Sequence, residues 1–280
     1  MSREQKVALV TGASSGFGLL TSVALAHKGF RVMATLRNPA SSEPLMERAR
    51  RDGVEGRIET AVLDVTEPAA IEAVIGDVRS RYGRIDVLVN NAGFAVGGFI
   101  EDVPMEAFRR QLETNVFGLM AVTKAVLPMM RERGGGCIIN IGSMSGRFAF
   151  PGYGAYAVSK FAVEGFSESL RLEMKPFGVH VVLLEPGAYR TAIWQKGFDT
   201  IHAPEASAYR SLLERTLRIT RKSAENAPDP QEVADRIVQI VGLRKPRFRY
   251  PLGKGSSLAL FTRAVVPWAW YERFVGRMIK

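Results

Sequence analysis

The sequence predicts an α/β fold: a single domain built on a doubly wound, seven-stranded parallel sheet with helices on both faces. Short apolar runs alternate with segments of helical periodicity along most of the 280 residues, an order typical of parallel strands joined by crossover helices. Most of these runs are continuously apolar, as expected for strands that are covered on both faces. A glycine-rich turn directly follows the first run.

The elements follow in order along the chain. The predicted strands are residues 7–10, 31–36, 57–63, 85–89, 137–141, 179–184 and 248–250. The predicted helices include residues 19–27, 68–81, 104–133, 155–175 and 229–241. Asp229 is expected to cap the last helix, with Pro230 in its first turn.

One domain is expected over residues 1–255. Its helical segment 192–226 follows the sixth predicted strand, and ligands bind outside the carboxyl ends of the strands in open parallel sheets. We therefore expect this segment to close over a substrate as a lid. A surface insertion without a role is the alternative.

Residues 256–280 are predicted to form a basic amphipathic tail. The chain has a net charge of +10, and from Leu243 onward it carries nine basic residues and one acid among many apolar and aromatic residues. We expect the tail to pack on the domain. Weak contact with an anionic membrane surface is the alternative. Nucleic-acid binding fits the charge, but no motif supports it, so no nucleic-acid partner is expected.

The sequence favours a cytoplasmic protein. Ten residues separate Met1 from Gly12, and they already read as a strand rather than a signal peptide. No run of about 18 apolar residues indicates a membrane span. The single cysteine, Cys137, lies in an apolar run and is expected in the core. The three histidines are not spaced as metal ligands, so no metal is expected.

The glycine-rich turn predicts a dinucleotide site. Glycines at this spacing allow a sharp turn and let backbone amides approach a pyrophosphate, while the next helix contributes its positive dipole. The context of strand, turn and helix is the one that this mechanism requires. The predicted contacts are Gly12, Ser14, Ser15, Gly16, Phe17 and Gly18.

The end of the second predicted strand favours NADP(H) over NAD(H). An acid there would bind a ribose 2′-hydroxyl, but the chain has Arg37, which suits a 2′-phosphate. NAD(H) stays the alternative, in which Arg37 is a solvated loop residue. Asp64 and Val65, after the third predicted strand, are candidate contacts to the adenine ring. Asp64 could equally be only a helix cap.

Tyr156 and Lys160 lie four residues apart in a predicted helix, so their side chains share one face. An adjacent cation lowers the pKa of a phenol and prepares it for acid–base work. A lone pair of this kind is more often a solvated helical pair. The apolar stripe expected on this helix is Val158, Phe161, Ala162, Gly165, Phe166, Ser169 and Leu170.

In combination, these motifs resemble the short-chain dehydrogenase/reductase (SDR) family over about residues 6–250. The residues that carry the resemblance are the glycine turn, Asn90, Asn91, Ala92, Gly93, Asn115, Ser143, Tyr156 and Lys160. Segments 34–37 and 161–165 resemble the hydroxysteroid- and retinol-dehydrogenase-like branch. The resemblance implies a Rossmann fold.

The resemblance also implies the catalytic roles. Tyr156 exchanges a proton with the substrate oxygen, which Ser143 also binds. Lys160 lowers the pKa of Tyr156 and contacts the nicotinamide ribose. Asn115 holds a water that relays protons to Lys160; a satisfied core amide is the alternative.

Further cofactor contacts are implied on the nicotinamide side. Asn91, Ala92 and Gly93 are expected in the cofactor site, with Asn90 and Gly93 flanking the nicotinamide. Pro186, Gly187 and Thr191 match the segment that contacts the carboxamide.

The expected function is an NADP(H)-dependent oxidoreductase that interconverts a lipophilic secondary alcohol and its ketone, or an aldehyde. The clues to a lipophilic substrate are Phe94, Phe148, Phe150, Tyr153 and Trp194. A non-catalytic nucleotide-sensing protein and a membrane-peripheral enzyme of the same chemistry are the alternatives. The family also implies a homodimer, through the helices that carry Asn115 and Tyr156.

Overall fold

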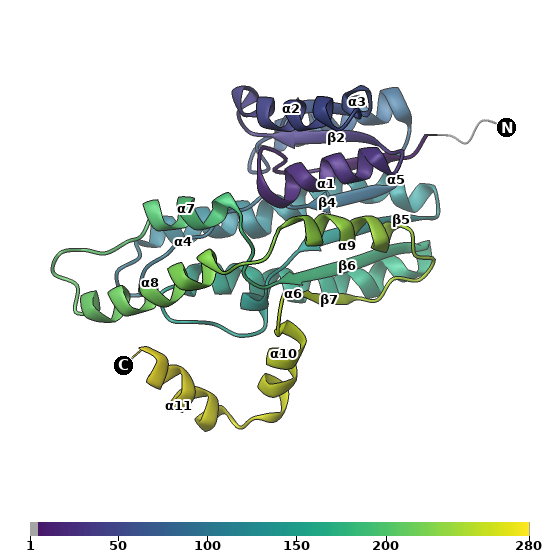
Figure 1. Ribbon diagram of the computed structural model, residues 1–280. Helices are drawn as coiled ribbons and strands as arrows, with labels where there is room; N and C mark the ends of the chain where they lie inside the picture. The colour runs from purple at the N-terminus through teal and green to yellow at the C-terminus, as the bar shows by residue number, and fades with distance from the viewer. Residues whose placement is uncertain (1–4, 280) are drawn as a thin grey trace.

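Seven parallel strands form one continuous sheet through the molecule (Figure 1). The computed structural model describes residues 5–279, apart from the side chains of Lys196, Met278 and Ile279. The strands are β1 (Val7–Val10), β2 (Arg31–Leu36), β3 (Ile58–Val62), β4 (Val87–Asn90), β5 (Gly136–Ile141), β6 (Val179–Pro186) and β7 (Arg249–Leu252). Their order is β3-β2-β1-β4-β5-β6-β7, which confirms the predicted seven-stranded sheet.

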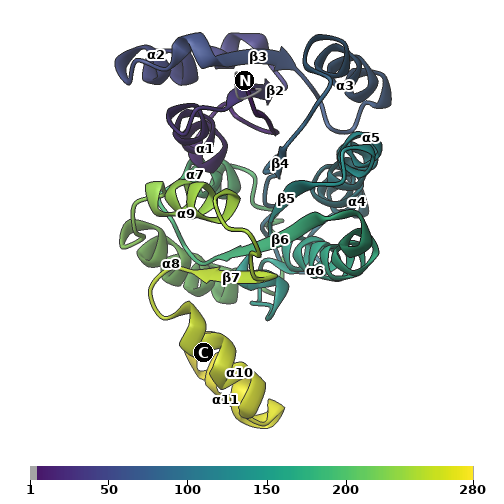
Figure 2. The same ribbon diagram turned by 90° about the vertical axis from the view of Figure 1, so that its right-hand side faces the viewer.

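Helices cover both faces of the sheet (Figure 2). One layer contains α1 (Gly16–His27), α2 (Glu43–Arg51) and α9 (Gln231–Val241). The other contains α3 (Pro68–Tyr82), α5 (Leu119–Glu132) and α6 (Gly154–Met174). The doubly wound Rossmann architecture is therefore confirmed.

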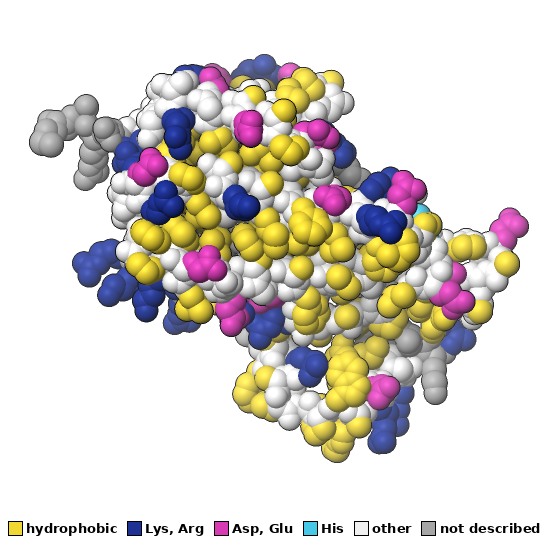
Figure 3. All heavy atoms as spheres, turned by 180° about the vertical axis from the view of Figure 1, so that it is seen from behind, with side chains coloured by type: hydrophobic (Ala, Val, Ile, Leu, Met, Phe, Trp, Pro, Cys, Tyr) yellow, Lys and Arg dark blue, Asp and Glu magenta, His cyan; other side chains and the backbone are white. Residues whose placement is uncertain are grey.

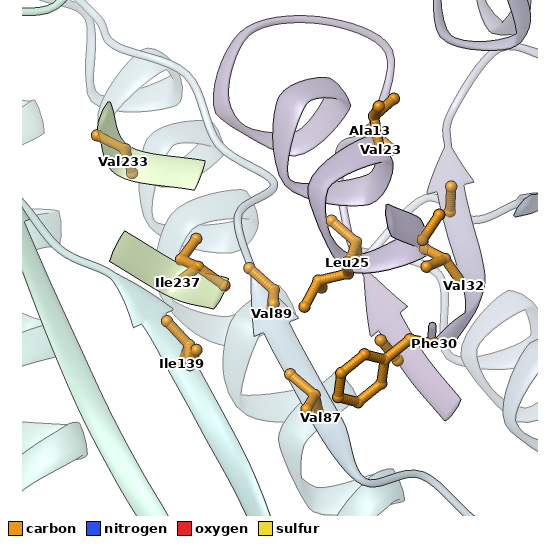
Figure 4. Close-up of a cluster of buried hydrophobic side chains, with 14 of the residues drawn as sticks. Ala13, Val23, Leu25, Phe30, Val32, Val87, Val89, Ile139, Val233 and Ile237 are labelled. Atoms are coloured by element: carbon orange, nitrogen blue, oxygen red, sulfur yellow. The ribbon is translucent and has the colours of Figure 1, made fainter. Parts of the chain in front are cut away.

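Alternation of side chains along each strand explains this layering. Ala8 and Val10 of β1 pack with α1 and α9, whereas Val7 and Leu9 pack with the opposite layer. Figure 4 shows Val87, Val89 and Ile139 of the sheet meeting residues from α1 and α9. Burial of each such side chain contributes about 1.5–3 kcal/mol, so a strand that is apolar on both faces is stable only between two helical layers.

The predicted helix 104–133 is interrupted. The structure has α4 (Met105–Leu112), a wide helical turn η3 (Glu113–Gly118) and then α5. The turn η3 has the hydrogen-bonding pattern of a π-helix, a form that occurs mostly as short bulges within α-helices. The predicted helix boundaries were correct, but its regularity was not.

Two helices lie over the carboxyl ends of the strands, α7 (Ala192–Asp199) and α8 (Arg210–Glu225). Between them, the amide of His202 donates to the carbonyl of Gly97 (3.0 Å). At the start of α8, the ring of Tyr209 stacks on Phe99 with centroids 4.8 Å apart. These contacts attach the segment to the loop that follows β4. Its role as a lid stays a prediction.

The chain ends in α10 (Ser256–Val265) and α11 (Trp268–Ile279), which project from the body beside β7 (Figures 1 and 2). The Tyr271 hydroxyl of α11 donates to the carbonyl of Ala149 (3.1 Å). Within the described chain, every helix is too short or too polar to cross a membrane.

Candidate active site

The glycine turn after β1 has space only for backbone. Gly12 and Gly16 adopt φ of +68° and +55°, in the left-handed region that favours glycine. A Cβ atom on Gly12 would lie 2.8 Å from the Cα of Ala92, and one on Gly18 would lie 2.3 Å from the carbonyl oxygen of Gly12. The turn therefore presents backbone groups at close range.

The loop after β4 holds this turn in place. The Thr11 hydroxyl accepts hydrogen bonds from the amides of Asn91 and Ala92, both at 3.0 Å. The Asn91 side-chain amide donates to the carbonyls of Thr11 and Gly12, both at 2.9 Å. Asn91 and Ala92 thus lie at the glycine turn, where the sequence predicted a cofactor contact.

The start of α1 fits a pyrophosphate. Ser15 occupies the N-cap position with an extended backbone, but its hydroxyl makes no capping hydrogen bond. The free backbone N–H groups of the first turn and the helix dipole favour an anion at this point. Ser14 belongs to the same turn and is partly exposed.

Two residues face this turn from the loop after β6. The ring of Phe17 packs edge-on against Tyr189, with centroids 5.6 Å apart. A Cβ atom on Gly16 would lie 3.4 Å from side-chain atoms of Thr191. Thr191, which is far away in sequence, is thereby brought to the predicted phosphate site.

The residues that bear on cofactor choice lie after β2 and β3. Arg37 is exposed and makes no ion pair with the described residues. Asp64 accepts hydrogen bonds from the backbone amide and the hydroxyl of Thr66 (3.0 and 2.8 Å), so it caps its own turn. Val65 is buried against Gly118, where a Cβ atom would lie 2.6 Å from its side chain.

Ser143, Tyr156 and Lys160 converge beyond the carboxyl end of β5. The Ser143 hydroxyl accepts a hydrogen bond from the amide of Ser145 (3.1 Å) and acts to lower the pKa of the Tyr156 phenol. Lys160 is buried, and its Nζ donates to the carbonyl of Ile141, the last residue of β5 (2.7 Å). Nζ lies 5.6 Å from the centroid of the Tyr156 ring.

The ionisation of this group differs from expectation. Burial raises the pKa of Tyr156, and the neighbouring Ser143 hydroxyl only partly opposes this effect. The expected lowering of this pKa by Lys160 is not found, because desolvation outweighs it and the ammonium group is directed at Ile141. Burial lowers the pKa of Lys160 to about 8.

Asn115 lies in the wide turn η3 and is buried. Its Oδ1 accepts from the amide of Phe94 (3.1 Å), and its Nδ2 donates to the Phe94 carbonyl (3.0 Å) and to the hydroxyl of Ser159 (3.2 Å). Both amide N–H groups are therefore used. The side chain connects the loop after β4, where Gly93 packs against it, to the residue before Lys160.

Asn90 does not reach the cleft with its side chain. It is buried, and its amide donates to Thr123 of α5 (2.8 Å) and to Asn140 of β5 (2.9 Å). The expectation that Asn90 flanks the nicotinamide is corrected by this core network. Neighbouring residues of a strand point to opposite faces, so only Asn91 is directed toward the glycine turn.

Pro186 is the last residue of β6, and Gly187 follows it beside the first residues of the tail. The Gly187 amide donates to the carbonyl of Leu252 (2.9 Å), and a Cβ atom on Gly187 would lie 3.3 Å from the hydroxyl of Ser256. The predicted carboxamide segment is therefore in contact with the start of α10.

The predicted aromatic residues divide between several elements. Phe94 packs against Val96 and Ala155, and the indole of Trp194 donates to the carbonyl of Tyr189 (2.7 Å). Tyr153 pairs with Gly98, which also pairs with His202 between α7 and α8. The rings of Phe148 and Phe150 meet edge-on at 5.4 Å.

Sequence analysis missed an ionic cluster behind Lys160. Glu164 of α6 and Glu185 of β6 are both buried, and Arg249 donates to Glu164 (3.1 Å) while Arg147 donates to Glu185 (2.9 Å). A signal was available, because the acidic Glu185 directly follows the predicted strand 179–184 and directly precedes Pro186.

Comparison with known proteins agrees with this geometry. The short chain dehydrogenase family matches residues 6–201. The uncharacterized oxidoreductase YusZ of Bacillus subtilis is 48% identical over 278 residues, which cover 98% of this chain and 99% of YusZ. Human 17-beta-hydroxysteroid dehydrogenase type 1 is 36% identical over 258 residues, covering 87% of this chain and 76% of that protein.

A solved structure adds a nucleotide complex. An actinorhodin polyketide ketoreductase variant determined with NADPH superposes with a TM-score of 0.77 and 32% identity, covering 91% of this chain and 98% of the other. The matched family region contains the glycine turn and also Ser143, Tyr156 and Lys160, the three residues that converge beyond β5. The chain belongs to the short-chain dehydrogenase/reductase family of oxidoreductases.

Proposed function

We propose that this protein is an NADP(H)-dependent oxidoreductase that interconverts a lipophilic secondary alcohol and its ketone, or an aldehyde, with Tyr156 as the acid and base. The observation that carries the proposal is the grouping of Ser143, which acts on the pKa of the Tyr156 phenol, with the buried Lys160, whose Nζ lies 5.6 Å from the centroid of the Tyr156 ring. These groups lie at the same end of the sheet as the glycine turn. A proton donor and a dinucleotide cradle thus share one edge.

The residues of the glycine turn would hold the pyrophosphate, and Arg37 would hold the 2′-phosphate. Tightly packed glycines and the uncapped start of α1 fit an anionic dinucleotide. The exposed guanidinium of Arg37 is free of acidic partners in the described chain, as a phosphate ligand requires. When bound, the nicotinamide supplies or accepts the hydride.

The side chains of the protein donate the proton in one direction of the reaction and accept it in the other. In ketone reduction, the carbonyl carbon gains the hydride, and the carbonyl oxygen takes a proton from the Tyr156 hydroxyl. Ser143 donates a hydrogen bond to that oxygen and stabilises the negative charge that develops on it. Lys160 holds its Nζ 5.6 Å from the centroid of the Tyr156 ring, where a positive charge would offset part of the desolvation cost of the phenolate that remains. Alcohol oxidation uses the same steps in reverse.

The substrate class is inferred from the surroundings and from a relative. Phe94, Tyr153 and Trp194 bring apolar surface to the loops around Tyr156. The human relative is named for a steroid hydroxyl group, which is a lipophilic secondary alcohol. A pocket lined by aromatic side chains with a few polar groups suits such a molecule.

Tyr156→Phe tests the catalytic part. Consumption of NADPH with a panel of lipophilic ketones should fall by about 10²–10⁴-fold, because the variant has no transferable proton. NADPH affinity should be retained. Tyr82→Phe, far from the site, is the matched control and should keep full turnover. A nucleotide-sensing protein would instead bind NADPH with no turnover of any substrate in the unaltered chain.

Arg37→Asp tests the cofactor preference. An aspartate there would repel a 2′-phosphate and accept hydrogen bonds from a 2′-hydroxyl, so the ratio of NADPH to NADH affinity should fall by at least about tenfold. Arg133→Asp, at the far end of α5, controls for the change in net charge. An unchanged ratio would contradict the NADP(H) assignment.

We also propose a homodimer built on α6 and η3. Phe117, Val158 and Phe161 are large apolar side chains that are 47–54% exposed on these two neighbouring elements. A contiguous apolar patch of this kind is typical of an interface. Light scattering should give a dimer for the unaltered chain and a monomer for Phe161→Glu. A monomer in both cases would exclude this interface.

A further inference from the structure

The tail helices expose an unusual amount of apolar surface. Among the described large apolar side chains that are exposed, six belong to α10 and α11: Leu258, Phe261, Val265, Trp268, Trp270 and Phe274. Each is 59–70% exposed. Single exposed apolar residues need no explanation, but a cluster of this size does.

The spacing of these residues gathers them on helix faces. Leu258, Phe261 and Val265 are three and four residues apart, which places them on one face of α10. Trp270 and Phe274 are four residues apart on α11. Arg273 and Arg277 follow on that same face of α11, so aromatic and cationic side chains alternate along it.

The opposite side of the two helices is fixed to the protein. Val275 is buried, and Tyr271 donates to the Ala149 carbonyl (3.1 Å). The guanidinium of Arg263 lies over the rings of Trp268 and Tyr271, at 5.1 and 5.3 Å from their centroids, and thereby joins α10 to α11. The apolar faces therefore belong to a structured element with one side attached.

Charge indicates what covers these faces. Between Lys254 and Arg277 the chain has four basic residues and a single acid, Glu272. Figure 3 shows Lys and Arg side chains among the hydrophobic ones where the tail projects at the bottom of the view. Trp and Arg side chains on an amphipathic helix suit the headgroup layer of an anionic bilayer. A second copy of this tail would bring like charges together.

The tail also touches both sides of the active site. Ser256 at the start of α10 lies against Gly187, next to the end of β6. Tyr271 of α11 bonds to Ala149, in the loop between Ser143 and Tyr156. A surface held by α10 and α11 would thus lie close to the loops that receive the substrate.

We propose that α10 and α11 dock the enzyme on an anionic lipid bilayer, and that its substrate is a lipophilic carbonyl or alcohol dissolved in that bilayer. The docking surface consists of Leu258, Phe261 and Val265 of α10 and Trp270 and Phe274 of α11, together with Arg273 and Arg277. The inference about the substrate rests on the proposed function, whereas the inference that α10 and α11 dock on a bilayer does not.

Flotation of the full chain with lipid vesicles tests the docking. It should bind phosphatidylcholine vesicles that contain phosphatidylserine, bind pure phosphatidylcholine vesicles at least about tenfold more weakly, and release in high salt. Arg273→Gln with Arg277→Gln should weaken binding by at least about tenfold, since each cation near the surface contributes about fivefold. Trp270→Ser with Phe274→Ser should also weaken it.

Matched controls come from other surfaces. Leu172→Ser removes a comparably exposed apolar residue of α6, and Arg131→Gln with Arg133→Gln removes two exposed cations of α5. These variants should bind vesicles like the unaltered chain. The docking is overturned if the unaltered chain does not bind anionic vesicles at low salt, or if the controls lose as much binding as the tail variants. It is also overturned if the tail variants only convert a dimer to a monomer, which would assign the face to a second copy.

Activity separates this proposal from the proposed function. The tail variants should reduce a small water-soluble ketone at the unaltered rate, and should be slower only with a lipophilic ketone presented in anionic vesicles. Equal rates for all variants on the vesicle substrate would overturn substrate entry from the bilayer. Vesicle binding without turnover of any ketone would leave the docking intact and refute the enzymatic function.

Discussion

The carboxyl groups of Glu164 and Glu185 meet in the interior, one helical turn from Lys160. Glu185 is fully buried and Glu164 is only 7% exposed. Glu164 Oε1 and Glu185 Oε2 are buried without a hydrogen-bond donor among the described residues, so a negative charge on both carboxyl groups is disfavoured. Burial and the neighbouring Glu185 carboxylate raise the pKa of Glu164 to about 7.

This pair joins four elements of the proposed site. Arg147, which follows Ser143 by four residues, donates to Glu185 (2.9 Å), and Arg249 of β7 donates to Glu164 (3.1 Å). Glu185 directly precedes Pro186 at the end of β6. The pair therefore positions the loop of Ser143, helix α6 and the predicted carboxamide segment relative to one another.

Glu164→Gln should remove a pH dependence of stability. A carboxyl whose pKa is raised on folding stabilises the protein below its unfolded pKa, near 4.5, and this contribution is lost as pH rises through about 7. The free energy of unfolding of the unaltered chain should thus fall by ~1–3 kcal/mol between pH 5 and pH 8 relative to the variant. Urea denaturation at both pH values measures this difference.

Glu168→Gln is the control for that experiment. Glu168 also pairs with Arg249 (2.6 Å), but its side chain is largely exposed. This variant should keep the pH dependence of the unaltered chain. If the stability of Glu164→Gln changes with pH as much as that of the control, the raised pKa of Glu164 is refuted.

Lys160→Met should separate stability from activity. Burial lowers the pKa of Lys160 to about 8, so folding disfavours its ammonium form. A lowered pKa gives stability above the unfolded value, near 10.5, that is lost as pH falls through about 8. At pH 7 the variant should therefore match or exceed the stability of the unaltered chain, by up to ~2 kcal/mol, while turnover falls by about 10²–10⁴-fold.

The hydrogen bond from Lys160 to Ile141 offsets part of that gain. The difference in stability should shrink and reverse as pH rises from 8 toward 10, as thermal unfolding over this range would show. If Lys160→Met loses the same amount of stability at every pH, the pKa of Lys160 is not lowered on folding.

The central sheet was predictable because each central strand is apolar on both faces. Val7 to Val10 are all buried, and two helical layers are the simplest way to cover such a strand. The wide turn η3 was not predictable, since its altered hydrogen bonding leaves the apolar spacing of the segment nearly unchanged.

The apolar stripe expected on α6 is buried only in part, since Leu170 lies in the core and Phe166 packs against it. Val158 and Phe161 were placed in the apolar stripe, but both are exposed. The buried face instead carries Lys160, Glu164 and Ser167, whose polar groups bond within the protein. Apolar spacing does not predict the buried face of a helix whose polar side chains point into the protein. The hydrogen-bond partners of such side chains come from distant parts of the chain, so the local sequence does not reveal them.

Gly146→Ala should disturb the site without touching substrate. A Cβ atom on Gly146 would lie 2.9 Å from the carbonyl oxygen of Lys160, which belongs to the rigid backbone of α6. The short turn that follows Ser143 would have to move away from α6. Turnover should fall by about tenfold or more through lost positioning of Ser143, while NADPH affinity stays the same.

Gly165→Ala is the matched change on the same helix. No atom lies within 4 Å of the added Cβ, and alanine favours a helix by about 0.5–1 kcal/mol over glycine. That variant should be slightly more stable and fully active. Steady-state kinetics gives the turnover of both variants, and thermal unfolding gives their stability. Equal turnover of Gly146→Ala and Gly165→Ala would show that the turn after Ser143 can shift without loss of activity.

Ser15→Ala tests whether the start of α1 is reserved for a ligand. Replacing an N-cap serine with alanine usually costs about 1 kcal/mol, but the Ser15 hydroxyl makes no capping hydrogen bond. The free energy of unfolding of the variant should therefore lie within about 0.5 kcal/mol of that of the unaltered chain. Its NADPH affinity should be about tenfold weaker, since a hydrogen bond to a charged group contributes about 1.5–3 kcal/mol.

Asp229→Ala is the opposite case, because Asp229 accepts a hydrogen bond from the Gln231 amide (2.8 Å) at the start of α9. It should lose about 1 kcal/mol of stability and keep its NADPH affinity. Urea denaturation measures the stability of each variant, and fluorescence titration measures its NADPH affinity. If Ser15→Ala loses stability but keeps its NADPH affinity, the Ser15 hydroxyl is an ordinary helix cap and the pyrophosphate lies elsewhere.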